Sequence, residues 1–253
     1  MPFLPSLLFA GIISTLAGLL VGLPSLRLRG LYLAITTFAF GFIVEHLSSS
    51  WVSLTRGANG LAVPPASIFG FSFDTDRRFF FLALPLTAAA VIFTRNLIRT
   101  RAGRSWAAVR DRDLAAEAIG ISLFRYKLSA FCVSSFYAGV AGALSAHYLQ
   151  YISPSNFGLF VSIQYLAMII VGGLGSVLGT IFGALFMTLV PELLKILPDL
   201  LRESFPVIVE RFADLNLTLF GLIIMLFVMF EPKGLNGIWQ NIKTYWRMWP
   251  YTH

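Results

Sequence analysis

Residues 4–23 read LPSLLFAGIISTLAGLLVGL, twenty consecutive positions without a charged side chain. An apolar α-helix of about this length crosses the hydrocarbon core of a bilayer. No Lys or Arg precedes the stretch, and Arg27 and Arg29 follow it, which reverses the charge order of a secretory signal peptide. We therefore predict a retained membrane-spanning helix.

The rest of the 253-residue chain has the same character, because 57% of its residues are hydrophobic and only 12% are charged. That charged fraction is roughly half the usual value for a soluble domain, so a soluble fold is excluded. We predict an all-α polytopic membrane protein with about seven transmembrane or broken helices, at 4–23, 31–47, 79–98, 128–150, 159–174, 177–197 and 215–230. The second and fifth segments are short and interrupted by glycine, so we expect them to be broken or re-entrant.

Charge predicts the orientation of these segments. Loop 95–127 holds eight Lys or Arg against three acidic residues, and cytoplasmic loops carry such an excess. Alternating outward from it gives an N-out, C-in topology with 13 of the 19 basic residues inside, and places the long loop 48–78 and the net acidic loop 198–214 outside. Membrane orientation accounts for the net charge of +7, so we expect no nucleic-acid partner.

The chain is predicted to divide into a permease domain at 1–237, with 95–127 as its cytoplasmic loop, and a tail at 238–253. Aromatic residues and cations alternate in the tail, a mixture typical of the headgroup layer of the bilayer. We predict an interfacial cytoplasmic anchor from these residues: Trp239, Tyr245, Trp246, Trp249 and Tyr251, with Lys243 and Arg247.

Glycines spaced every four residues predict close helix packing, the favoured interpretation of Gly175, Gly179 and Gly183. A second pattern pairs Tyr32-Leu33-Ala34-Ile35 with Tyr165-Leu166-Ala167-Met168, two tetrapeptides that run in opposite directions in this topology. Chance and an inverted repeat of the transporter type both explain the match, and an inverted repeat would border a translocation pathway. The candidate pathway residues are Tyr32, Thr36, Thr37, Tyr165, Met168, Gly172 and Gly173.

The chain has no pattern for intramembrane catalysis or nucleotide binding. It lacks H-E-x-x-H and the Walker A motif, and its single cysteine, Cys132, allows no cysteine-rich metal cluster. Four ionisable residues lie near the ends of spans, where interfacial hydration favours a boundary role: Glu45, His46, His147 and Glu192. We predict no catalytic residue, no metal site and no cofactor, and any ATP must then be bound by a partner.

Loop 95–127 reads as two short helices, the first capped by Ser105 and the second running from Asp113 to Gly120. Helices this short are unstable alone in water, so they need a surface to pack on. Two interpretations are open, packing against the protein's own spans or docking to a partner. The candidate coupling residues are Trp106, Val109, Leu114, Ala115, Ala116, Glu117, Ala118 and Gly120.

This loop resembles the cytoplasmic coupling region of LivM-type permeases, the branched-chain amino-acid subunits of bacterial ABC importers. The resembling stretches are 103–111, 114–120 and 127–131, and further blocks follow in family order at 26–37, 54–60, 141–148, 163–175 and 220–235. The resemblance implies a multi-pass protein of the bacterial inner membrane that moves solute by alternating access. It also implies four further components: a second permease subunit, two ATP-binding subunits and an extracytoplasmic solute-binding protein.

Two departures from the family keep alternatives open. Such permeases usually carry more apolar segments ahead of the Leu26-Arg27-Leu28-Arg29-Gly30 block than the single one here, so a truncated, non-conducting scaffold subunit is one alternative. Leu31 stands where the family often has an acidic residue, and residues 42–46 also differ from the usual pattern. Since related permeases serve urea, other small amides or other amino acids, those cargoes are the second alternative.

Overall fold

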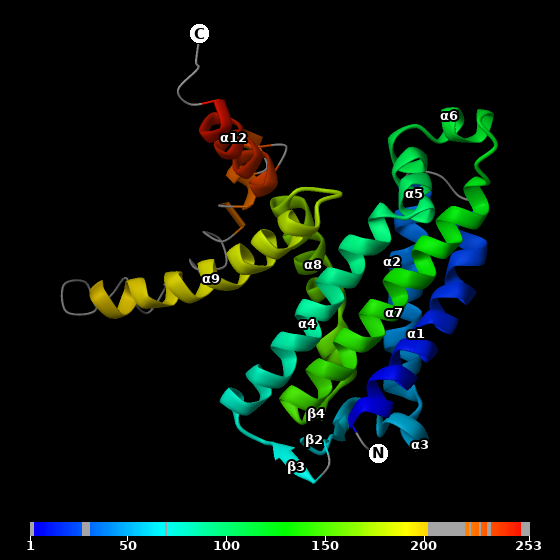
Figure 1. Ribbon diagram of the computed structural model, residues 1–253. Helices are drawn as coiled ribbons and strands as arrows, with labels where there is room; N and C mark the ends of the chain where they lie inside the picture. The colour runs from blue at the N-terminus through cyan, green and yellow to red at the C-terminus, as the bar shows by residue number, and fades with distance from the viewer. Residues whose placement is uncertain are drawn as a thin grey trace. The chain divides into compact units, whose positions relative to one another are not determined.

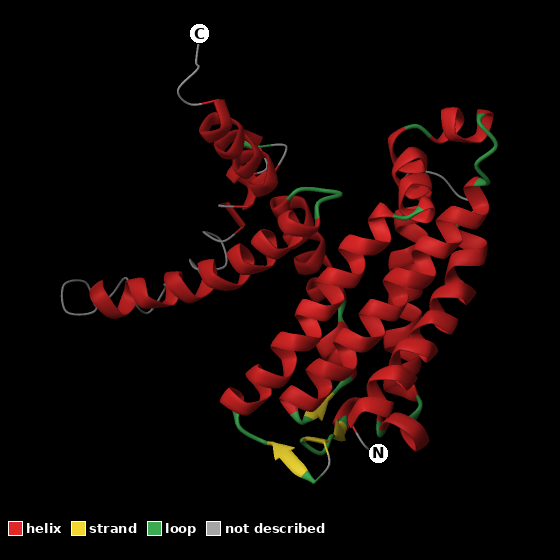
Figure 2. Ribbon diagram, in the orientation of Figure 1, coloured by secondary structure: helices red, strands yellow, loops and turns green. Residues whose placement is uncertain are grey.

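The computed structural model describes residues 3–26, 31–68, 70–201, 221–222, 224–227, 229–231 and 234–248. These residues are predominantly helical (Figure 2). Several positions used in the predictions of orientation and of the tail lie outside the described residues: Arg27, Arg29, Lys233, Trp249, Tyr251 and the loop from 202 to 214. The chain forms two compact units, Met1–Leu159 and Phe160–His253, and helix α12 (Gly234–Met248) runs across position 237.

The first unit is built on four long helices, α1 (Phe3–Ser25), α2 (Leu31–Ser50), α4 (Asp76–Arg99) and α7 (Leu123–Leu149). Short elements lie at one end of this bundle, and α5 (Arg101–Asp111) and α6 (Asp113–Ala118) lie at the other (Figure 1). Helix α4 therefore connects two opposite ends of the unit, as the alternation between an outer loop and a cytoplasmic loop predicts.

Small residues allow α1 and α7 to approach closely. A Cβ at Gly11 would lie 2.6 Å from Phe136 Cε2, and one at Gly139 would lie 2.6 Å from Ser14 Cβ. At Gly142, on the same helix as Gly139, a Cβ would meet nothing within 4 Å. Helix α4 is joined to α7 by the Thr94 hydroxyl, which donates to Tyr137 Oη at 2.8 Å.

The predicted outer loop 48–78 folds into short elements. These are α3 (Val52–Thr55), η1 (Gly57–Asn59), β1 (Leu61–Ala62), β2 (Ala66–Ile68) and β3 (Phe71–Phe73). Strand β2 pairs antiparallel with β3, and β1 pairs with β4 (Tyr151–Ile152), which follows α7. A small buried cluster of Phe3, Leu7, Ala66 and Phe79 closes this end.

The second unit contains α8 (Leu159–Gly172), α9 (Val177–Leu201) and α12. Helical residues are also described at 221–222, 224–227 and 229–230, within the predicted last span. The glycine-rich turn 173–176 separates α8 from α9, and Gly173 and Gly175 have φ of 110° and 79° there. Positive φ is accessible to glycine without a steric cost, which explains why the fifth predicted segment ends at this point.

Four helical stretches among the described residues are long and apolar enough to cross a membrane: Phe3–Pro24, Asp76–Arg99, Leu123–Leu149 and Pro154–Gly172, the last including η2 (Pro154–Phe157). They expose large apolar side chains such as Ile13, Leu20 and Phe81, as expected when lipid is the solvent. The all-α polytopic class is confirmed, and the count of seven and the orientation stay predictions. Helix α2 is continuous through Gly41, so the interruption predicted there is wrong.

Candidate functional site

Helix α5 packs against the protein's own span through Trp106. The indole Nε1–H donates to Ser129 Oγ on α7 at 2.9 Å, and the Ser129 hydroxyl in turn donates to the Tyr126 carbonyl at 2.9 Å. The helix begins earlier than predicted, because Thr100 and not Ser105 is its N-cap, and Thr100 Oγ1 accepts the Gly103 N–H at 3.3 Å. For Trp106, and for the half-buried Val109 on the same helix, the structure shows packing within the chain.

Helix α6 presents most of its surface outward. Ala116 is only 2% exposed, whereas Leu114 is 69% and Ile119 is 75% exposed. Ala115, Glu117 and Ala118 are exposed as well. One side of α6 is therefore packed against the protein, and the other exposes apolar side chains and a carboxylate.

Gly120 ends α6 as the sequence predicts. Its φ is 85°, the Ile121 N–H donates to the Ala116 carbonyl at 3.0 Å, and the Gly120 N–H donates to the Glu117 carbonyl at 2.9 Å. This is the Schellman arrangement, which satisfies the last carbonyls of a helix and uses glycine at the left-handed position. The motif holds the exposed side of α6 in one orientation relative to α7.

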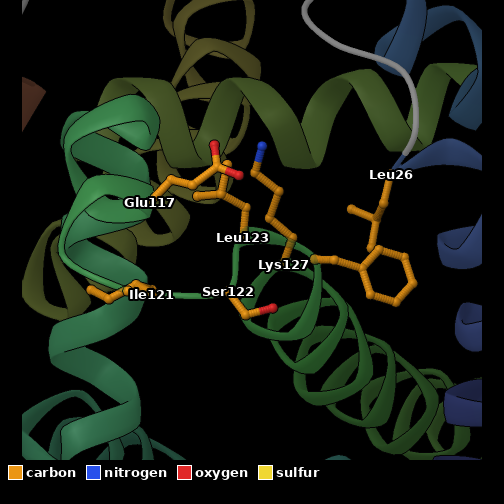
Figure 3. A pocket seen from close by; sticks show the side chains of 8 residues that line it. Leu26, Glu117, Ile121, Ser122, Leu123 and Lys127 are labelled. Carbon is orange, nitrogen blue, oxygen red and sulfur yellow. The ribbon is translucent and has the colours of Figure 1, made fainter.

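A cavity of about 440 Å³ lies between the α6–α7 connection and the end of α1. Glu117 and Lys127 both line it, and their charged groups point to the same side (Figure 3). Leu26, Ile121, Leu123 and Phe124 supply apolar walls, and Gly120 and Ser122 complete the lining. Lys127, Ser122 and Leu26 were not predicted as site residues, and Leu26 is brought to this cavity only by the fold.

The surroundings of α6 are strongly basic. Seven arginines between Arg95 and Arg125 are exposed, and Lys127 is half-buried. Within the described part of this loop there is one ion pair, between Arg110 and Asp111 at 2.9 Å, and both of its side chains are well exposed. Such a surface pair contributes little stability. Most of the positive charge of the loop is therefore not neutralised by acidic side chains of the loop itself.

The predicted pathway residues on α2 belong to the first unit. Tyr32 and Thr36 are four residues apart and therefore share a face of the helix. Thr36 Oγ1–H donates to the Tyr32 carbonyl at 2.8 Å, and Thr37 Oγ1–H donates to the Leu33 carbonyl at 3.1 Å. A hydroxyl that donates to its own helix keeps an oxygen that can accept a further hydrogen bond.

The predicted pathway residues on α8 belong to the second unit. Tyr165 is exposed, Met168 is half-buried, and Gly172 and Gly173 are buried. The two glycines lie where α8 and α9 approach closely. A Cβ at Gly183 would lie 2.8 Å from Gly172 N and 2.9 Å from Gly172 Cα.

The three glycines predicted for helix packing have different positions. Gly179 and Gly183 are buried on α9 facing the end of α8, and Gly175 lies exposed in the turn between the helices. Gly234 was not predicted, although a Cβ there would lie 2.6 Å from Gly173 N. A positive φ of 68° at Gly234 allows α12 to begin against this turn.

No group of three or more His, Cys, Asp or Glu side chains suited to a metal ion occurs within the part of the chain that the structure describes. Of the ionisable residues near span ends, His147 is buried and hydrogen-bonded to Ser6 Oγ and to the Pro64 carbonyl. Two local features of the helices stand out, the exposed short helix α6 and the glycine-rich turn between α8 and α9.

Comparison with known proteins agrees with this picture. A family model described as "Branched-chain amino acid transport system / permease component" matches residues 1–229. The high-affinity branched-chain amino acid transport system permease proteins LivM of Salmonella typhimurium and of Escherichia coli are each 32% identical over 250 residues, covering 89% of this chain and 55% of the relative. A probable LivM permease of Methanocaldococcus jannaschii is 25% identical, covering 90% of this chain and 68% of that protein.

The chain thus spans about half the length of the first two of these relatives. No solved structure matches it. The resemblance inferred from the loop and its neighbouring blocks is confirmed by the family match.

Proposed function

This chain belongs to the family of branched-chain amino acid transport permease components, and from that membership we propose that it is a permease subunit of a bacterial ABC importer for branched-chain amino acids. The family is one of transport permeases and not of enzymes. With its several apolar helices, the chain is a multi-pass inner-membrane protein.

The observation that carries the proposal is the exposed side of α6. Leu114 on α6 and Ile119, the residue that caps its C-terminus, are large exposed apolar side chains, and burying them against a partner would be favourable by about 1.5–3 kcal/mol each. Glu117 is exposed on the same helix, so a partner groove with apolar walls and a cation would fit this surface. We propose that an ATP-binding subunit supplies the groove.

A mechanical connection from α6 into the membrane supports the same role. Helix α6 contacts α5 and α7, and Trp106 ties α5 to α7 through Ser129. Helix α7 in turn packs closely on α1 at Gly11 and Gly139. A displacement of α6 by the ATPase would therefore move two spans, and we propose that this movement opens the pathway alternately to each side of the membrane.

The remaining components follow from the same proposal. A second permease subunit would complete the pathway, two ATP-binding subunits would supply the energy, and an extracytoplasmic solute-binding protein would deliver the solute. ATP is then bound by partners, and this chain needs no cofactor of its own. Solute would pass hydroxyls and backbone carbonyls on α2 and α8, at the residues Tyr32, Thr36, Thr37, Tyr165, Met168, Gly172 and Gly173.

The test is purification of the tagged full chain with its co-expressed ATPase in mild detergent. We expect the wild type to retain the ATPase and Glu117→Arg to release it, because the reversed charge would face the partner's cation. Asp74→Arg is the matched control, since Asp74 is also exposed but pairs with Arg78 in the first turn of α4, at the end of that helix away from α5. Leu114→Asp tests the apolar contact independently of charge.

Three results would count against the proposal. Failure of the folded wild type to retain any ATPase would contradict the importer role. Retention by both Glu117→Arg and Leu114→Asp would move the docking surface away from α6. Equal loss with Asp74→Arg would show that charge reversal acts on the whole protein and not on a contact.

A further inference from the structure

Helix α12 carries an apolar strip that continues beyond its contact with α9. Positions 235, 238, 239, 242, 245 and 246 are apolar or aromatic and fall within about 120° of the helix circumference at 3.6 residues per turn. Gly234 and Gly237 are buried, whereas every described side chain from Ile238 to Trp246 is exposed. The first turn is therefore anchored in the protein, and the rest of the apolar strip needs an apolar environment.

An apolar groove of about 320 Å³ lies between α9 and α12. Phe182 and Phe186 line it from α9, and the Phe182 ring is 5.8 Å from the Trp239 ring. Leu235, Ile238, Trp239 and Ile242 line it from α12. All six lining side chains are hydrophobic, so the groove fits a hydrocarbon chain and not a polar solute.

The charge of α12 indicates what kind of apolar molecule would fit the groove between α9 and α12. Residues 234–248 include Lys243 and Arg247 and no acidic residue, and Lys243 is exposed at the border of the apolar strip. The helix also follows directly on the predicted last span, which places it at the membrane surface. Trp and Tyr with a cation beside them are typical of the lipid headgroup layer.

We propose that the groove between α9 and α12 binds an acyl chain of an anionic phospholipid whose phosphate contacts Lys243. The lipid would cover the exposed apolar strip and hold α12 in the plane of the headgroups. A predicted cytoplasmic location agrees with this, because anionic lipids are concentrated in that leaflet. The proposal concerns a lipid site and is independent of the cargo and of the ATPase contact.

The experiment uses the full chain with Cys132→Ser, reconstituted in vesicles of phosphatidylcholine and phosphatidylglycerol. A fluorophore is attached at Tyr245→Cys, on the apolar strip, or at Thr244→Cys, on the polar side one residue away. In parallel vesicles, bromine on the acyl chains of one lipid or of the other quenches fluorescence on contact. We expect strong quenching at 245 and weak quenching at 244, and stronger quenching per molecule by brominated phosphatidylglycerol.

Variants at Lys243 and Trp239 separate the headgroup contact from the groove. Lys243→Gln should lower the preference for phosphatidylglycerol about fivefold, the effect of one basic side chain at an anionic surface, and Lys243→Arg should keep it. Trp239→Gln should lower quenching by both lipids, and Trp239→Phe should not. The control for folding is the size-exclusion profile of each variant, which should match that of the wild type.

Other outcomes would overturn the proposal. Equal quenching at 244 and 245 would mean that α12 does not lie on the bilayer. Equal quenching by the two lipids, or no effect of Lys243→Gln, would exclude an anionic headgroup site. Self-quenching at 245 that rises with the protein-to-lipid ratio would assign the apolar strip to a second copy of the chain.

Discussion

His147 joins three parts of the chain that are far apart in sequence. Its Nδ1–H donates to the Pro64 carbonyl at 3.0 Å, its Nε2 lies 2.9 Å from Ser6 Oγ, and its ring meets the Phe3 ring edge-on at 5.2 Å. Only 7% of the residue is exposed. One side chain on α7 thus connects α1 to the folded outer loop.

We expect His147→Ala to destabilise the protein by about 1–3 kcal/mol, because the substitution leaves the Pro64 carbonyl without its side-chain donor and opens a cavity beside Phe3. His46→Ala is the matched control, since His46 is exposed and its contact with Ser50 Oγ is 3.5 Å long. Equilibrium unfolding in mixed micelles with increasing SDS measures both changes. Equal shifts for the two variants would contradict the role of His147.

Helix packing in the first unit depends on which glycines face the neighbouring helix. On α7, Gly139 faces α1 so closely that a Cβ would lie 2.5 Å from the Ala10 carbonyl oxygen. Gly142 lies less than one turn away and faces open space. Both glycines are on the same helix, so they form an internal comparison.

We expect Gly139→Ala to destabilise the protein by about 1–3 kcal/mol, because the methyl group must push the α1 backbone away. Gly142→Ala should be neutral or stabilising by up to about 1 kcal/mol, since alanine is the better helix former and has room there. The same SDS unfolding assay compares them. A greater loss for Gly142→Ala would mean that α7 packs through the other side.

The sequence predicted the helices better than their contacts, for a physical reason. Apolar runs of membrane length are visible in any sequence, and the observed helices at the six predicted positions up to 197 overlap those runs. Lipid and protein neighbours are both apolar, however, so hydrophobicity does not distinguish Gly139 from Gly142. Thr100 and Ser105 are likewise both able to cap a helix, and only the turn after α4 selects Thr100.

The candidate docking site was predicted in part for a similar reason. The sequence identified the two short helices and the glycine stop at Gly120, and it left open whether they pack inward or dock outward. In the structure the two helices differ. Helix α5 packs inward, with Trp106 hydrogen-bonded to Ser129, whereas Leu114 and Ile119 are exposed. The difference depends on how α5 and α6 are attached to α7, and the periodicity of such short segments does not show this attachment.

The topology of the whole chain decides whether these parts can work as proposed. With Cys132→Ser as background, single cysteines at Ser67, Ala118 and Thr244 replace exposed residues of the outer loop, α6 and α12. Because 13 of the 19 Lys and Arg are predicted inside, we expect a membrane-impermeant maleimide to label only position 67 in intact cells. Positions 118 and 244 should react only after permeabilisation.

Position 244 also tests the number of spans. Seven spans place four crossings between the cytoplasmic loop and the tail, so 118 and 244 must lie on the same side. If segment 159–174 were re-entrant, three crossings would remain and 244 would react in intact cells while 118 would not. Labelling of 118 and not 67 from outside would instead invert the orientation, and α6 would then be unable to meet a cytoplasmic ATPase.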